Sequence, residues 1–261
     1  MYNIFVGKPA RIVSKDNPLI KSFRKVACAP RHGRKEGLFL LEGRHLLKEA
    51  LKTGWPLESV ILEESLWPSW ENLLLALEAR VALVPSAVAR GIGTQPAPEG
   101  VFALGERKEA AMPEAEPDGR YLYLDCVQDP ANAGVLVRSA AVFGFGSAFI
   151  SPGSADPFGP VALSRSAGAA FRLPLPACSE NELLAWAERW RATIVAAEED
   201  APPLGAAPDG PVVLIVGNEG HGLSPALRSA STLAGIPMAK GWDSLNVAAA
   251  GSILMRDLSG L

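Results

Sequence analysis

The stretch Val212–Ser224 has the sequence VVLIVGNEGHGLS, a short β-branched apolar run that ends abruptly in glycines and polar residues. A continuous apolar run bounded by turn residues is typical of a buried parallel strand. Glycines at positions 217, 220 and 222 let the backbone of the following loop come close to a ligand. The stretch therefore predicts a strand over 212–216 that carries a binding loop at its carboxyl end, where parallel sheets bind ligands.

A second junction of this kind follows within the next 30 residues. The run Ile236-Pro237-Met238 is followed by Ser244-Leu245-Asn246-Val247 and then by small residues up to Met255. Ser244 is a candidate helix N-cap, which would leave free backbone amides aimed at the site. An ordinary tight turn and a capped packing helix explain either junction alone. The two in tandem favour a small-molecule pocket.

A third junction lies at residues 125–144, with the sequence DCVQDPANAGVLVRSAAVFG. It predicts a helix with Asn132 in the cap or first turn and Arg138 about one and a half turns further in. Small residues between Gly134 and Ala141 leave this helix thin enough for another helix to approach closely. An arginine on an otherwise apolar helix needs a carboxylate, a phosphate or an RNA backbone as its partner. A structural salt bridge would meet that need equally well.

Secondary-structure signals divide the chain into two α/β regions. In the first region, a helix opened by Asn17-Pro18 precedes alternating strands and helices up to residue 104. In the second region, strands are expected at 121–125, 148–151, 193–197, 212–216 and 233–237, and helices at 132–143, 180–190 and 244–258. This alternation predicts a mostly parallel sheet. We therefore expect a smaller domain over 1–105, an exposed charged linker over 106–118 and a larger domain over 119–261.

The net charge of −3 hides a strong asymmetry along the chain. Residues 1–55 contain 12 Lys or Arg against 4 acids, a net of +8, and the remainder contains 13 against 24, a net of −11. A run of charged residues is usually a solvated face. In this run, however, few acids lie between the basic residues, and such an excess of positive charge is what binding to a phosphate backbone requires. The candidate nucleic-acid contacts on one helix and the loop after it are Lys21, Arg24, Lys25, Arg31, Arg34 and Lys35.

Several classes of protein are disfavoured by the composition. No run approaches the roughly 18 apolar residues of a membrane helix, and residues 1–8 lack a hydrophobic signal segment, so we expect a cytoplasmic protein without a membrane partner. Three scattered cysteines and three histidines give no disulfide framework and no metal-ligand spacing, so no metal is expected. The chain has no GxxxxGK[ST] or GxSxG segment, and its glycine pairs lie in the wrong context for a dinucleotide fingerprint.

The three junctions, in this order, resemble the motifs of the SpoU (TrmH) family of S-adenosylmethionine-dependent RNA ribose 2′-O-methyltransferases, part of the SPOUT superfamily. The matching segments are Asn132-x5-Arg138 with residues 140–144, then Gly217–Leu223, and then residues 236–238 with 244–247. Residues 12–21 and 39–51 are similar to the substrate-binding domain attached to ribosomal-RNA members of that family.

The resemblance implies an α/β fold with a carboxyl-terminal trefoil knot, a rare topology, and a homodimer whose interface completes the active site. It implies that S-adenosylmethionine is the cofactor and that RNA, most simply ribosomal RNA, is the partner. By similarity, the donor would be bound around Gly217, Asn218, Glu219, Gly220, Ile236, Met238, Leu245 and Asn246. The transfer site would be surrounded by Asn132, Arg138, Glu219, Ser244 and Asn246.

Methyl transfer from a sulfonium mainly asks the enzyme to align the ribose oxygen and to help its proton leave. We hypothesise that Arg138 engages the phosphate and 2′-hydroxyl of the target, that Asn132 orients it, and that Ser244 and Asn246 fix the donor loop. Guanidinium is protonated at any ordinary pH, so Arg138 would polarise the hydroxyl rather than act as a simple base. Arg165, after the second expected strand, is a further candidate for RNA contact.

Two other functions remain open on the sequence. One is a catalytically silent RNA-binding protein that keeps the fold. The other is an enzyme that uses the same donor on a base nitrogen or on transfer RNA.

Overall fold

The computed structural model describes residues 9–77, 79–218, 222–241 and 244–261. Contacts divide the chain into two compact units, which are described separately below. Unit 1 comprises Met1–Lys108 with Phe158–Ser164, and unit 2 comprises Glu109–Pro157 with Arg165–Leu261. Across the described residues, no helix combines the length and the hydropathy needed to cross a membrane.

Unit 1 is built on a five-stranded mixed sheet with the order β1-β4-β3-β5-β2. Strand β5 runs antiparallel to both of its neighbours, and the other pairs are parallel. The strands are β1 (Ala10–Arg11), β2 (Leu38–Glu42), β3 (Leu57–Glu63), β4 (Arg80–Val84) and β5 (Val101–Glu106). The helices are α1 (Pro18–Cys28), α2 (Pro30–Lys35), α3 (Arg44–Lys52), α4 (Trp67–Leu74) and α5 (Ser86–Ala89), with a 3-10 turn at Glu64–Leu66.

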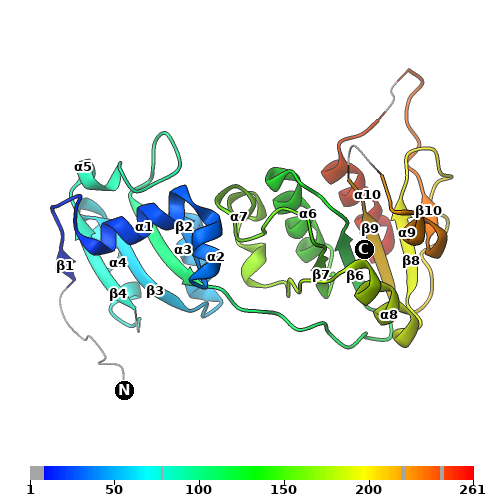
Figure 1. The fold of residues 1–261 in the computed structure, drawn as a ribbon, viewed down its shortest axis with the longest axis horizontal. Helices are drawn as coiled ribbons and strands as arrows, with labels where there is room; N and C mark the ends of the chain where they lie inside the picture. Colours follow the sequence, from blue (N-terminus) through cyan, green and yellow to red (C-terminus); the bar gives the residue numbers. More distant parts are fainter. Residues whose placement is uncertain (1–8, 78, 219–221, 242–243) are drawn as a thin grey trace. The chain divides into compact units, whose positions relative to one another are not determined.

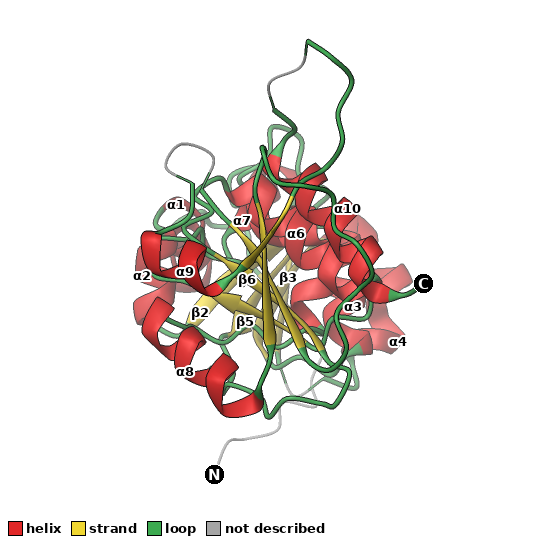
Figure 2. Ribbon diagram, turned by 90° about the vertical axis from the view of Figure 1, so that its right-hand side faces the viewer, coloured by secondary structure: helices red, strands yellow, loops and turns green. Residues whose placement is uncertain are grey.

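Helix α1 begins at a cap that its sequence specifies. The Asn17 side chain accepts a hydrogen bond from the Leu19 amide at 2.9 Å, and Pro18 occupies the first turn, where its missing N–H costs nothing. The apolar face of α1, with Ile20 and Phe23 fully buried, packs against the sheet. Helices α1 and α2 lie on one side of this sheet and α3 and α4 on the other (Figure 2).

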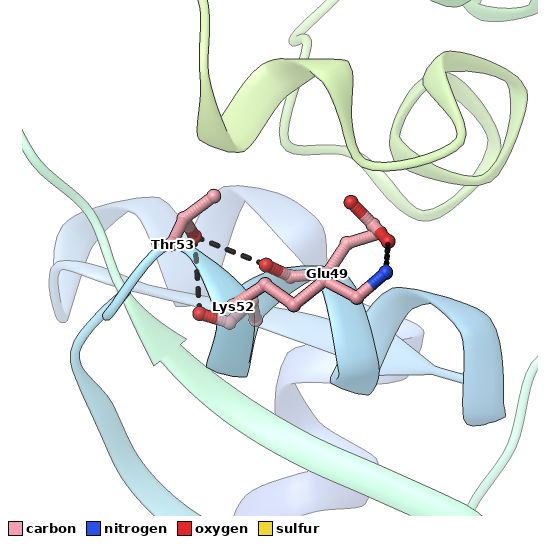
Figure 3. Close-up of polar contacts among 4 residues, drawn as sticks. Glu49, Lys52 and Thr53 are labelled. Atoms are coloured by element: carbon pink, nitrogen blue, oxygen red, sulfur yellow. Dashed lines mark hydrogen bonds and ion pairs between the residues drawn. The ribbon is translucent and has the colours of Figure 1, made fainter.

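Helix α3 ends in a group of local polar contacts (Figure 3). The Thr53 hydroxyl donates to the carbonyl oxygens of Glu49 and Ala50, at 3.1 and 3.0 Å, in addition to the backbone hydrogen bonds that these carbonyls accept from the amides of Thr53 and Trp55. Lys52 forms an ion pair with Glu49 at 2.7 Å. This closes α3 before the turn that leads into β3.

Unit 2 contains a five-stranded, fully parallel sheet with the order β10-β8-β9-β6-β7. The expected mostly parallel α/β architecture is therefore confirmed for this unit. Its strands are β6 (Arg120–Leu124), β7 (Ser147–Ile150), β8 (Thr193–Ala197), β9 (Val212–Val216) and β10 (Thr232–Ala234). Every residue of the central strand β9 is buried, which explains its continuous apolar run.

Helices cover both faces of the parallel sheet (Figure 1). They are α6 (Pro130–Val142), α8 (Glu180–Trp190), α9 (Pro225–Ala230) and α10 (Val247–Ser259), with a 3-10 turn at Ala169–Phe171. Most of helix α7 (Pro160–Ser166) belongs to unit 1. On the face covered by α8 and α9, Tyr121, Phe149 and Trp186 pack ring against ring, with centroids 4.8–5.8 Å apart. Helices α6 and α10 pack together on the other face.

The close approach of α6 and α10 depends on small side chains, as the sequence predicts. The hydroxyls of Ser139 and Ser252 are hydrogen-bonded at 2.7 Å across the two helices. A Cβ added at Gly251 would lie 2.5 Å from the Leu136 Cδ2 atom and 3.1 Å from Val216. Any larger residue at position 251 would therefore require the Leu136 and Val216 side chains to move.

Several local expectations are corrected by the structure. Helix α10 is capped by Asn246 and not by Ser244, because the Asn246 Oδ1 atom accepts hydrogen bonds from Ala248 and Ala249 at 3.0 and 3.2 Å. Strand β10 is shorter than expected, since it ends before Gly235. The basic loop expected after α1 is largely a second helix, α2.

The segment that joins the two sheets is held by contacts with unit 2 over its second half. Residues 107–119, all of them described, contain no helix or strand. From Met112 onward the segment is fixed to unit 2, where Met112 and Ala115 pack on the apolar core. The Trp186 indole donates a hydrogen bond to the Pro113 carbonyl at 2.7 Å. The second half of the expected exposed linker is therefore anchored.

Candidate functional site

A cavity of about 510 Å³ lies at the carboxyl edge of the parallel sheet. It is enclosed by the ends of three neighbouring strands, at Ala197, Val216 and Ala234, and by the first turn of α10. The motifs at residues 217–223 and 236–247 meet here with the start of α6, which comes much earlier in the chain. The expected site residues that line it are Asn132, Gly217, Asn218, Ile236, Met238, Ser244, Leu245 and Asn246.

The loop after β9 is held by its own asparagine. The Asn218 side-chain amide donates to the Cys126 carbonyl at 2.9 Å, and the Asn218 carbonyl accepts from the Gly222 amide at 3.1 Å. The first bond ties this loop to the one that follows β6. Glu219 and Gly220, both expected at the site, lie outside the described residues.

A second tie joins the amino-terminal turns of α6 and α10. The Asn246 side-chain amide donates to the Asn132 Oδ1 atom at 3.2 Å. Asn132 lies in the first turn of α6, where Asp129 is the cap and accepts hydrogen bonds from the amides of Ala131 and Asn132. The two asparagines therefore stand side by side at the wall of the cavity.

Two large apolar side chains remain unusually open at this cavity. Met238 is 37% and Leu245 41% exposed, and both line it together with the half-buried Ile236. Exposed apolar groups around a concave site are typical of a pocket that an organic ligand covers. The cavity volume is also within the range of roughly 300–1,000 Å³ that small-molecule sites occupy.

Arg138 is the one described member of the expected transfer site that does not line the cavity. Its side chain is exposed on α6, and among the described residues its guanidinium has no hydrogen bond or ion pair. The structural salt bridge left open by the sequence is therefore not found in this part of the chain. Val135 and Val142 share this face of α6, since they are three and four residues away, and Val142 is 66% exposed.

The candidate RNA contacts of unit 1 differ in how much they are already engaged. Arg24 is half-buried, and its Nε atom donates to the Gly91 carbonyl at 2.7 Å, so part of its role is structural. Lys21 pairs with Asp16 at 3.1 Å. The exposed candidates of unit 1 are Lys25 on α1 and Arg34 and Lys35 on α2. Arg165, in the last turn of α7, is an exposed candidate in unit 2. The side chain of Arg31 is not among those described.

Two carboxylates at the cavity were not expected. Glu198 and Glu199 follow β8 directly and line the cavity beside Ala197. Their signal was present in the sequence, because an acidic residue at the carboxyl end of a parallel strand is a known position for ligand contact. Nothing in the local pattern distinguishes these acids from solvated ones, because no glycine and no Ser/Asn pair follows β8 directly.

Burial raises the pKa values of Asp125 and Cys178 in unit 2. Burial raises the pKa of Asp125, and the charge of Glu180 adds to this effect, while a hydrogen bond from Cys126 opposes it. Burial raises the pKa of the Cys178 thiol to about 12, with a further contribution from Glu182. Neither residue lines the cavity. Within the described parts of the chain, no three His, Cys, Asp or Glu side chains are grouped as a metal site would require.

A parallel sheet with a cavity of this kind, built from these motifs, defines a class of enzyme. Residues 119–256 match the SpoU rRNA Methylase family, and residues 17–103 match the MRM3-like substrate binding domain. The chain therefore belongs to the SpoU rRNA Methylase family, as the resemblance predicted. It is accordingly an RNA methyltransferase.

Similar proteins agree with this assignment over nearly the whole chain. The 23S rRNA (guanosine(2553)-2′-O)-methyltransferase RlmP of Bacillus subtilis (strain 168) is 30% identical, with 96% of this chain and 99% of the relative covered. The crystal structure of an AdoMet-bound rRNA methyltransferase from Sinorhizobium meliloti matches with a TM-score of 0.86 at 26% identity, covering 97% of this chain and 98% of that one. A crystal structure of an RNA 2′-O ribose methyltransferase matches with a TM-score of 0.80 at 31% identity, covering 95% and 97%. The expected donor, S-adenosylmethionine (AdoMet), is thus supported by a relative of the same fold.

Proposed function

We propose that this protein transfers the methyl group of S-adenosylmethionine to a ribose 2′-hydroxyl of ribosomal RNA. One observation carries the proposal: the second and third motifs and Asn132 of the first line a single cavity, in a chain whose fold matches an AdoMet-bound rRNA methyltransferase over 97% of its length. A catalytically silent protein would not need Asn132, Ser244 and Asn246 together at this cavity. A ribosomal substrate would place the protein in the cytoplasm.

The cavity has the properties that the donor requires. Its apolar lining, which includes Ile236, Met238 and Leu245, suits the adenine, and its backbone groups around Gly217 suit the adenine edge and the ribose. When bound, the donor supplies an electrophilic methyl group on a sulfonium. We assign the orientation of the target ribose to Asn132, Ser244 and Asn246, and we retain Glu219 and Gly220 as proposed site residues.

We further propose that Arg138 acts in a homodimer. Its face of α6 also presents Val142, and α10, which packs on α6, exposes 41% of Ile253. Exposed apolar side chains on two adjoining helices favour a contact with another protein surface. A second copy docked there would bring Arg138 to the cavity of its partner, which a single chain does not do. The carboxyl-terminal trefoil knot that the family implies is part of the same proposal.

The dimer can be tested by placing charge in this face. The double variant Val142→Asp, Ile253→Asp is expected to be monomeric. Burial of two unpaired carboxylates at an interface is unfavourable by more free energy than the apolar contact contributes. It should also lose methyl transfer. The matched control is Val13→Asp, at a valine that is 58% exposed in unit 1. Light scattering after size exclusion measures the mass, and a double variant that stays dimeric would contradict this interface.

Unit 1 is the proposed RNA-binding domain, with α1 and α2 as its contact surface. The variants Lys25→Ala and Lys35→Ala should each weaken RNA binding about equally for all sequences and lower the slope of log K against log salt by about 1. The control is Lys52→Ala, which is paired with Glu49 at the end of α3, a helix on the opposite side of the sheet. Fluorescence anisotropy at several salt concentrations measures the slope, and unchanged slopes for both variants would move the RNA surface elsewhere.

The reaction itself is tested by incubating the protein with methyl-labelled S-adenosylmethionine and either ribosomal or transfer RNA. Nucleoside mass spectrometry then identifies the product. A 2′-O-methylnucleoside in ribosomal RNA is the expected result. A methylated base, or label confined to transfer RNA, would replace the proposal by the second alternative, and no label in any RNA would favour a silent protein.

A further inference from the structure

The wall of the cavity formed after β8 is acidic. Glu198 and Glu199 line the main cavity, and Glu199 also lines an adjoining cavity of about 380 Å³ with Asp200, Ile236 and Lys240. Among the described residues that line the main cavity, there is no Lys, Arg or His. A ligand in this cavity therefore meets two carboxylates and no basic side chain of that lining.

The backbone fixes this acidic wall in place. The Glu198 amide donates to the Ala234 carbonyl at 3.0 Å, and the Gly235 amide donates to the Pro202 carbonyl at 2.8 Å. A Cβ at Gly235 would overlap the carbonyl oxygen of Ala201, so only glycine lets the two chain segments lie this close. The segment 198–202 is consequently held against the end of β10 and along the cavity.

The two carboxylates are not equivalent. Glu198 forms an ion pair with Arg228, from the last turn of α9, at 2.7 Å. Glu199 is exposed, and in the described parts of the chain it has no hydrogen bond or ion pair. With Glu198 paired to Arg228, Glu199 is the carboxylate without an ion pair among the described residues that line the main cavity.

We infer that Glu199 makes the cavity select the cationic methyl donor over its neutral product. This inference rests on the proposed function. S-Adenosylmethionine carries a sulfonium, an ammonium and a carboxylate, a net charge of +1 at neutral pH. In the reaction, the C–S bond breaks, sulfur keeps the electron pair, the methyl group binds the ribose oxygen, and the hydroxyl proton is released. The resulting S-adenosylhomocysteine has no net charge, so the attraction to Glu199 ends with transfer and the product is easier to release.

A different role for the same side chain predicts a different pattern. An acidic residue after a strand accepts hydrogen bonds from ribose hydroxyls in dinucleotide-binding folds. Donor and product share the same ribose, so that role would affect both ligands equally. Only the charge-based role separates the two ligands.

The test is calorimetric titration of the full-length protein with three ligands: S-adenosylmethionine, S-adenosylhomocysteine and sinefungin, which has a protonated amine in place of the sulfonium. Glu199→Gln should weaken the two cationic ligands by about three- to tenfold and leave S-adenosylhomocysteine nearly unchanged. The control is Glu188→Gln, at an exposed acid of α8 that lines neither cavity. In the wild type, added salt should weaken the cationic ligands more than the product, because it screens the charge.

The outcomes separate this inference from the function on which it rests. An equal loss for all three ligands would overturn selection by charge and support the ribose contact. Unchanged affinities in Glu199→Gln would overturn any role of this residue in binding. A wild-type protein that binds none of the three ligands would contradict the proposed function, and the inference would be rejected with it.

Discussion

Arg138→Ala is expected to lower the rate of methyl transfer by about 10²- to 10⁴-fold, the range typical for loss of a group that assists proton transfer. The affinity for S-adenosylmethionine should stay close to that of the wild type, because Arg138 does not line the donor cavity. Folding should be unaffected, since the side chain is exposed and its guanidinium has no partner among the described residues. Single-turnover methyl incorporation and calorimetry measure the two quantities.

Two further variants make this result specific. Arg138→Lys keeps the charge but not the planar, bidentate donor arrangement, so it should remain strongly impaired. Arg189→Ala removes another exposed arginine, on α8, and should retain full activity. Activity near the wild-type level in either Arg138 variant would remove this residue from the transfer step.

A mixed dimer shows which subunit Arg138 serves. The mixed dimer contains one Arg138→Ala subunit and one Asn246→Ala subunit. If Arg138 acts in the cavity of the partner subunit, this dimer has one site in which both the cavity and the arginine are intact. Activity should therefore return on mixing two inactive proteins. No recovery in verified mixed dimers would indicate that Arg138 acts within its own chain.

Gly235→Ala is expected to lower the free energy of unfolding more than any other substitution proposed here. The added Cβ would overlap the Ala201 carbonyl oxygen and lie 3.2 Å from the Glu198 oxygen, and backbone atoms of this kind cannot rotate away. Overpacking at such a position costs about 1–3 kcal/mol. The acidic wall should also be displaced, so donor binding should weaken together with stability.

Gly205→Ala is the matched control for this substitution. It lies in the connection between β8 and β9, which also contains the contact partners Glu198 and Ala201, and a Cβ there would meet no heavy atom within 4 Å. Its expected effect is neutral or slightly stabilising, since alanine reduces the freedom of the unfolded chain. Thermal unfolding with and without S-adenosylmethionine measures both variants, and a Gly235→Ala protein as stable as the control would contradict the close approach.

The features that were predictable from the sequence are those that local patterns encode. The apolar run Val212–Val216 could only be a buried strand, and the small residues of α6 indicated a close helix partner, which is α10. The family resemblance then identified the loops around the cavity. The cap of α10 was wrongly predicted at Ser244 instead of Asn246, because serine and asparagine are both good caps. Only the three-dimensional path of the chain decides which of them reaches the free amides.

The features that the sequence did not reveal depend on contacts between distant residues. Arg24 is engaged by Gly91, which is 67 positions away, so no local pattern distinguishes it from the exposed Lys25. Glu199 became part of the cavity because β10 pairs with β8 rather than with its sequence neighbour β9. Sheet order of this kind is a property of the whole unit and is not written in any single segment.

Asn246 carries two duties with one short side chain. Its oxygen begins α10, and its nitrogen holds Asn132 on α6. Aspartate or serine at position 246 could still cap α10 but would lose or weaken the hydrogen bond to Asn132. Glutamine is too long to cap the helix. A substitution at position 246 is therefore expected to affect the start of α10, its link to α6, or both.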